Sequence, residues 1–219
     1  MHVVVLYLCA AAVLIAGTQV LLELTVPGGR VPPWQAARLI WRRPVPPVAA
    51  GLVVLMVAMA IVQTVHPAVI GDLERDPAGG WWRCGTALLV QSSGWTQAVF
   101  NLAALGAVAP VAARTLGNWW ALIIFLVAGV ASHVVSTAGW SPHGGGDSVA
   151  ICGLVGALAV GYLLRGTRRD LRLKLLLVPA AGVLLCVLRN NHGVGVLVGC
   201  LLGVASAYRP ARVGSWRPD

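Results

Sequence analysis

Residues 190–207 read NNHGVGVLVGCLLGVASA, three polar side chains followed by an apolar run with glycines at four-residue spacing. A run of this length is close to what a helix needs to cross a hydrocarbon core. Small residues four apart lie on one helix face and let a second backbone approach closely in lipid. The stretch therefore predicts a membrane helix that begins at His192 and packs tightly against a neighbour.

The rest of the chain has the composition of a membrane protein. Of its 219 residues, 58% are hydrophobic and 11% are charged, and the mean hydropathy is +0.82. An ordinary soluble domain has about 25% charged residues, and its core cannot bury so much apolar surface. The composition excludes a disordered chain, a fibrous chain and an ordinary soluble enzyme, and it predicts an all-α polytopic membrane protein.

Seven apolar runs are expected to cross the membrane as helices. They cover residues 3–22, 47–65, 96–113, 118–137, 148–164, 174–188 and 193–207. The last three are short and glycine-rich, and each taken alone is also compatible with a re-entrant segment. The first run has no basic segment before it and no clear cleavage site, so we interpret it as a retained helix and not as a signal peptide.

Basic residues predict the orientation of these spans. With seven spans, only three of the sixteen lysines and arginines (Arg75, Arg83 and Arg189) fall on one side. The positive-inside rule then places the N-terminus outside and the C-terminus in the cytoplasm. We attribute the net charge of +9 to basic residues that set the topology and contact membrane lipids, and not to nucleic-acid binding. Abundant Ala, Gly, Val and Arg with a single Lys favour a bacterial plasma membrane.

No metal or other cofactor is expected. The five cysteines have no CxxC spacing, and four of them lie inside apolar runs. The alternative set of metal ligands is His133, His143, Asp147 and His192, but no established ligand spacing supports it.

Polar side chains gather at the outer ends of the expected helices. Because a polar group in a membrane costs free energy, these residues are functional candidates. Asn101, Ser148 and His192 begin three helices that run in the same direction, so we expect them at similar depth. Ser148 becomes a nucleophile if a base takes its proton, and a helix N-terminus favours the neutral form of His192. Backbone N–H groups at Ser148, with Asn101 and Gln97, are expected to stabilise an oxyanion.

Four motifs occur in a specific order. They are Trp82-Arg83, Phe100-Asn101, Gly146-Asp147-Ser148, and His192-Gly193-Val194-Gly195 followed by Gly199. In this order and topology they resemble the rhomboid family of intramembrane serine proteases. The resemblance implies a Ser148–His192 dyad that cleaves transmembrane or juxtamembrane segments of membrane proteins, and a role for Asn101 in the oxyanion hole.

The resemblance also implies a six-helix core preceded by one extra helix. The expected division is an extra transmembrane helix 1–24, a basic cytoplasmic loop 25–46, a rhomboid-like membrane domain 47–207 and a cytoplasmic tail 208–219. The loop 138–147 and the sixth span are candidates for a mobile gate.

Several positions depart from the family pattern. Gln97 replaces a histidine, Val149 replaces the glycine that commonly follows the nucleophile, and Cys152 replaces an aromatic residue. A glutamate common near the end of the second core helix is absent from residues 112–117. These departures leave open a rhomboid-like protein that binds transmembrane clients without cutting them.

The start of the fifth span allows a second interpretation, in which Ser148 is a helix N-cap and not a nucleophile. Adjacent residues at a helix start rarely converge, so Asp147 is not expected to complete a triad. For the whole chain, a small transporter is the third possible function. It predicts polar residues through the membrane midplane, whereas the polar residues here gather at the outer ends of the expected helices.

Overall fold

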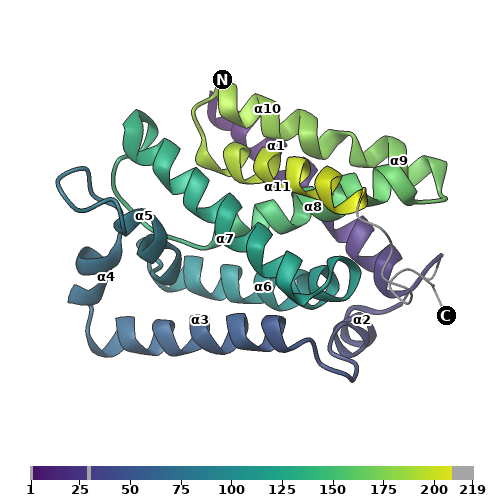
Figure 1. Ribbon diagram of the computed structural model, residues 1–219, viewed down its shortest axis with the longest axis horizontal. Coiled ribbons are helices and arrows are strands. Elements are labelled where there is room, and N and C mark those ends of the chain that lie inside the picture. The colour runs from purple at the N-terminus through teal and green to yellow at the C-terminus, as the bar shows by residue number, and fades with distance from the viewer. Residues whose placement is uncertain (1, 29–30, 209–219) are drawn as a thin grey trace.

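The structure, a computed structural model, describes residues 2–28 and 31–208 and confirms the all-α class (Figure 1). The helices are α1 (His2–Thr25), α2 (Pro33–Ile40), α3 (Pro47–Val65), α4 (Ala68–Leu73), α5 (Arg83–Thr86), α6 (Trp95–Leu116), α7 (Asn118–Val135), α8 (Ser148–Arg165), α9 (Arg169–Leu175), α10 (Leu177–Val187) and α11 (Asn191–Ala207). A 3-10 turn (η1, Ala87–Leu89) follows α5, and a π-helical turn (η2, Ser136–Trp140) follows α7. The expected tail 208–219 lies outside the described residues except for its first residue.

Five helices are long and apolar enough to span a membrane, and the chain is an integral membrane protein. These spans are Val4–Thr25, Pro47–Val65, Trp95–Leu116, Asn118–Trp140 and Ser148–Arg165, and α11 is a shorter apolar helix. Large apolar side chains such as Leu8, Val54 and Trp119 face outward. A soluble protein rarely exposes such a surface, whereas lipid solvates it.

The expected sixth span is not one continuous helix. Residues 174–188 fall in α9 and α10, which meet at Leu176. Pro179 has no N–H for the carbonyl of Leu175, so the i to i−4 ladder loses a bond at the point where the two helices join. The backbone N–H of Leu176 instead donates to the carbonyl of Leu173, as in a tighter turn. The expected loops 25–46 and 66–95 also contain short helices, namely α2, α4 and α5.

Helices α8 and α11 pack on each other through their backbones. A methyl group on Gly203 would lie 2.7 Å from the Cα atom of Ala157, and one on Gly199 would overlap the backbone of Gly153. The predicted close approach of the two helices is therefore confirmed. Because no side chains separate the backbones, the starts of α8 and α11 are held in a fixed relation.

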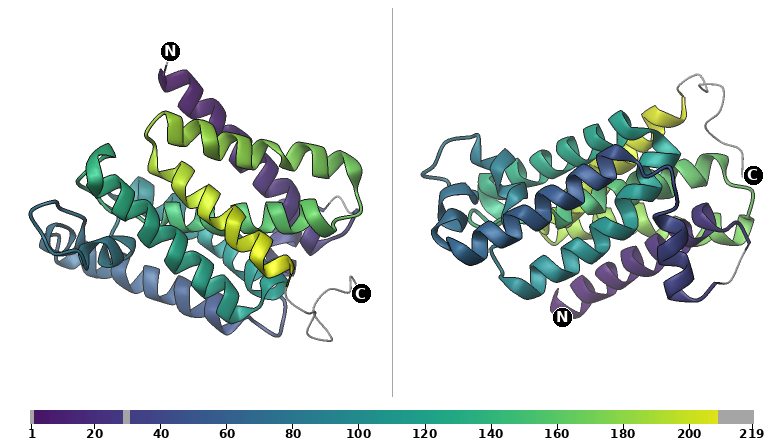
Figure 2. Two further views of the ribbon diagram at one scale, coloured as in Figure 1. Left: turned by 45° about the horizontal axis from the view of Figure 1, so that its top comes forward. Right: turned by 90° about the horizontal axis from the view of Figure 1, so that it is seen from below.

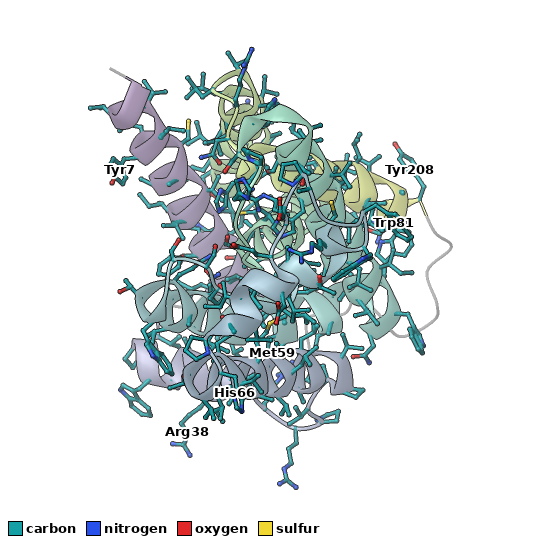
Figure 3. All side chains as sticks on the ribbon, turned by 90° about the vertical axis from the view of Figure 1, so that its left-hand side faces the viewer. Tyr7, Arg38, Met59, His66, Trp81 and Tyr208 are labelled. Atoms are coloured by element: carbon teal, nitrogen blue, oxygen red, sulfur yellow. The ribbon has the colours of Figure 1, made fainter. Side chains whose placement is uncertain are left out.

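Helix α1 does not pack beside α3, the next long helix in the sequence. It packs against α10, α8 and α6, whereas α3 packs on α6 and α7 (Figure 2). Tyr7 of α1 lies at the edge of the bundle and is largely exposed (Figure 3). At the other end of α1, the Glu23 carboxylate accepts from Arg168 Nη1 at 2.8 Å and from the Tyr162 hydroxyl at 3.4 Å. The extra helix is thus part of the wall around α8.

Candidate active site

A tightly held loop, residues 141–147, delivers Ser148 to the start of α8. Gly144 and Gly146 adopt φ of 107° and 156°, which side chains rarely tolerate. The buried Arg75 donates from Nε to the carbonyl of Ser141 at 2.8 Å, and its backbone N–H donates to the carbonyl of Gly144 at 3.1 Å. Arg75 therefore fixes the loop from the segment 66–95.

His133 clamps the same loop from α7. Its Nδ1 lies 2.7 Å from Arg75 Nη1, and its Nε2 lies 3.2 Å from the carbonyl oxygen of Gly146. Burial lowers the pKa of Arg75, but an arginine side chain still acts as a donor. Nδ1 is then the acceptor, and the proton sits on Nε2, where it donates to Gly146. Sequence reasoning singled out His133 as a polar residue but gave no role to Arg75.

The structure brings Ser148 and His192 together. Ser148 Oγ lies 3.0 Å from His192 Nε2, so its hydroxyl is directed at the histidine and not at a helix cap. Asp147 holds the N-cap position of α8, without a capping hydrogen bond from its side chain. The two residues come from α8 and α11, the pair whose backbones touch.

Asn190 determines which nitrogen of His192 carries the proton. Its Oδ1 accepts from the backbone N–H of His192 at 3.0 Å and lies 2.9 Å from Nδ1 of the same ring. Since Oδ1 is an acceptor, Nδ1 is the donor in this contact, and the neutral ring presents an unprotonated Nε2 to Ser148. A general base requires this tautomer. The sequence placed Asn190 at the helix start without assigning it this function.

Asn101 is buried beside the loop, with both N–H bonds of its amide in use. Nδ2 donates to Gln91 Oε1 at 2.8 Å and to Asp147 Oδ1 at 3.0 Å. Gln91 Nε2 donates to the same oxygen of Asp147 at 2.7 Å. Asn101 thus belongs to a buried network of three side chains next to the nucleophile.

Gln97 connects two loops. Its Oε1 accepts from the backbone N–H of Ser93 at 2.7 Å, and its Nε2 donates to the carbonyl of Gly145 at 3.1 Å. Asn101 and Gln97, the two side chains expected to stabilise an oxyanion, therefore lie next to the loop 141–147, where each donates to protein acceptors.

Asp147 faces the amides of Gln91 and Asn101. Its Oδ2 is buried and makes no hydrogen bond, and burial raises the pKa of this carboxyl above its usual value near 3.8. The contacts of Asp147 connect it to the amide network and not to the His192 ring.

A cavity of about 440 Å³ opens over the pair. Asn101, Ser148, Asn190 and His192 line it, together with Cys152 and with Tyr7 and Thr18 of α1. The remaining lining is formed mainly by apolar side chains of α1, α6 and α8. Cys152, which replaces an aromatic residue of the family pattern, lines the same cavity as His192.

The candidate metal ligands do not gather. Within residues 2–28 and 31–208, no three His, Cys, Asp or Glu side chains are placed to share a metal ion. His143 lies 3.9 Å from Asp76, while His133 contacts Arg75.

The Trp82-Arg83 motif lies in the first outer segment. The Arg83 guanidinium sits 5.4 Å from the ring centroid of Trp82 and donates to the carbonyl of Gly71 at 2.9 Å. Trp81 is 89% exposed and points outward (Figure 3). Exposed tryptophans beside an arginine suit the headgroup zone of a membrane.

Fold and site together define a polytopic helical membrane protein with a serine–histidine pair at one end of two touching helices. A family model described as the Rhomboid domain matches residues 78–209, more than half of the chain. The chain belongs to the rhomboid family. The match includes Asn101, Ser148 and His192, and the family includes intramembrane serine proteases that act on transmembrane substrates. Comparison with curated proteins gives no match.

Proposed function

We propose that this protein is an intramembrane serine endopeptidase that cleaves transmembrane or juxtamembrane segments of other membrane proteins. The observation that carries the proposal is the 3.0 Å contact of Ser148 Oγ with His192 Nε2. Asn190 supports it, because it holds the histidine in the tautomer that accepts a proton.

The reaction follows from this geometry. Ser148 Oγ attacks the carbonyl carbon of the substrate while its proton passes to His192 Nε2. The peptide C–N bond breaks, the amine leaves with that proton, and an acyl-enzyme ester remains on Ser148. A water molecule then gives a proton to Nε2 and attacks the ester, and the proton returns to Ser148 as the acid departs.

Oxyanion stabilisation comes from the start of α8 and from Asn101. The first N–H groups of a helix have no partner within the helix, and Ser148 is the first residue of α8. One N–H of Asn101 joins them after it leaves Gln91 or Asp147.

The substrate segment has to unwind at the scissile bond, because a helical peptide carbonyl is occupied by its own hydrogen bond. Residues that break a helix near the outer end of the substrate segment favour this step. Water reaches Ser148 from the same end.

The site lies in the outer half of a bacterial plasma membrane, with the N-terminus outside and the C-terminus in the cytoplasm. This orientation rests on the concentration of basic residues at the opposite end of the helices.

Labelling with a serine-directed fluorophosphonate tests the proposal. We expect purified protein to be labelled, Ser148→Ala to abolish labelling, and His192→Ala to slow it by about 100-fold or more. Ser206→Ala, at the far end of α11, is the matched serine control and keeps normal labelling. An absence of labelling in folded protein, both in detergent and in liposomes, would overturn the proposed activity.

A further inference from the structure

Helix α1 closes the apolar side of the cavity that holds Ser148 and His192. Side chains along the length of α1 form one wall: Leu6, Tyr7, Ala10, Val13, Leu14, Gly17, Thr18 and Leu21. In the described residues, α6 and α10 make almost no direct contact with each other, and α1 packs against both. A segment that approaches the pair from the lipid between α6 and α10 therefore meets α1 first (Figure 2).

The two ends of α1 are held differently. At the inner end, Glu23 is largely buried and binds Arg168 and Tyr162. Among the described side chains, the outer half of α1 forms no hydrogen bond or ion pair with the core, and Leu8 faces outward. Apolar packing between helices gains little over apolar packing against lipid. The inner end of α1, at Glu23, is therefore an anchor, whereas the outer half is held only by apolar packing.

The other candidate gates are held more firmly. The loop 141–147 is fixed by Arg75 and His133. Helix α10 fits closely on α11, since a methyl group on Gly182 would lie 2.8 Å from Val196. Among the described residues, the outer half of α1 has neither such hydrogen bonds nor a glycine that brings it close to a neighbouring helix.

We propose that α1, from its anchor at Glu23 to its outer end, is a movable wall that admits the substrate. It swings away from α8 and α10 about its inner anchor, and one apolar transmembrane segment takes its place beside the cavity. The cavity suits this occupant, because Ser148, Asn190 and His192 lie at its outer end, where the scissile bond is exposed, and most of the remaining lining is apolar. This inference rests on the proposed function.

A disulfide between α1 and α8 tests the movement. A methyl group on Gly17 would lie 3.0 Å from Val155 Cγ1, which brings the two Cβ atoms near the separation that a disulfide requires. The variant is Gly17→Cys/Val155→Cys in a Cys152→Ala background, which removes the nearest competing thiol. The substrate is a quenched fluorescent single-span peptide with glycines near its outer end, reconstituted with the protein in liposomes.

We expect oxidation to lower peptide cleavage by about tenfold or more and reduction to restore it, while fluorophosphonate labelling changes by less than about twofold. The comparison is between the two redox forms of one protein. Equal cleavage by both forms would overturn the movable wall. An absence of labelling in the reduced form would instead count against the proposed function itself.

A second lock serves as the control. Gly182→Cys/Val196→Cys ties α10 to α11 and leaves α1 free, so we expect cleavage to continue after oxidation. If this lock stops cleavage and the α1–α8 lock does not, α10 is the moving wall and the proposal is wrong.

A second readout does not depend on turnover. In a Ser148→Ala background, saturating single-span peptide should slow disulfide formation between the cysteines introduced at positions 17 and 155 by about tenfold, because it holds α1 away from α8. A soluble peptide without the apolar segment should have no effect. Unchanged disulfide formation with the single-span peptide would contradict the displacement of α1. This readout remains valid even if the first lock distorts the site and reduces labelling.

Discussion

At the scale of single residues, Asn190 is the side chain that holds His192 in the tautomer that the proposed mechanism requires of a base. Asn190→Ala removes the acceptor for Nδ1–H and frees the ring to adopt the other tautomer, so we expect fluorophosphonate labelling to slow by about 100-fold. Asn190→Asp keeps an acceptor at the same place, so its labelling should slow less than that of Asn190→Ala. Because the N-cap is also lost in the alanine variant, thermal stability is measured in parallel. Normal labelling by Asn190→Ala would show that the ring needs no such support.

Asp147 leads to a prediction about stability and pH. Burial raises the pKa of its carboxyl in the folded protein, so folding favours the protonated form. The associated stability is present below the unfolded pKa and is lost as pH rises through the folded pKa. We expect the apparent Tm in detergent to fall over that range in the wild type and to fall less in Asp147→Asn.

The matched variant at this position is Asp147→Leu. It should lose more stability than Asp147→Asn at every pH, because the N–H groups of Gln91 and Asn101 lose their shared acceptor, at about 1–3 kcal/mol each. Equal Tm values for the two variants would contradict this account of the network.

At the scale of helices, the distance between Ser148 and His192 depends on the backbone contact of α8 with α11. Gly199→Ala places a methyl group against the backbone of Gly153 and should force the helices apart, which lowers both the Tm and the labelling rate. Gly161→Ala is the control on α8, because nothing lies within 4 Å of its added methyl group. If the two variants behave alike, the contact does not set the geometry of the pair.

At the scale of the whole molecule, the proposed orientation predicts which residues face the outside. Trp81→Cys should react with a membrane-impermeant maleimide in intact cells, and Arg172→Cys only after permeabilisation, because both positions are exposed at opposite ends of the helices. The native cysteines are buried or partly buried, which keeps the background low. The reverse pattern would place the C-terminus outside.

The sequence predicted what depends on local pattern. Apolar runs give helices, and the residues at helix starts placed Ser148 and His192 at one depth. The role of Arg75 had no local signal, because an arginine in an outer loop shows its buried partners only after the loop 141–147 folds over it. An apolar helix likewise has no sequence feature that identifies the helices it packs against, so the position of α1 could not be predicted from the sequence. The sixth span was expected as one helix, and its division into α9 and α10 was not predicted although Pro179 lies within it.

The N–H groups of the Asn101 amide are already hydrogen-bonded before a substrate binds. In the resting protein both N–H bonds are engaged by Gln91 and Asp147, so a neutral substrate carbonyl gains little by competing for them. In the proposed reaction, the oxyanion is a far stronger acceptor than the carbonyl and draws one N–H away only as negative charge develops. Such an interaction stabilises the transition state without tightening the ground-state complex. Asn101→Ala should therefore lower kcat and leave KM nearly unchanged, because the amide responds to the charge of the transition state and not to the neutral substrate.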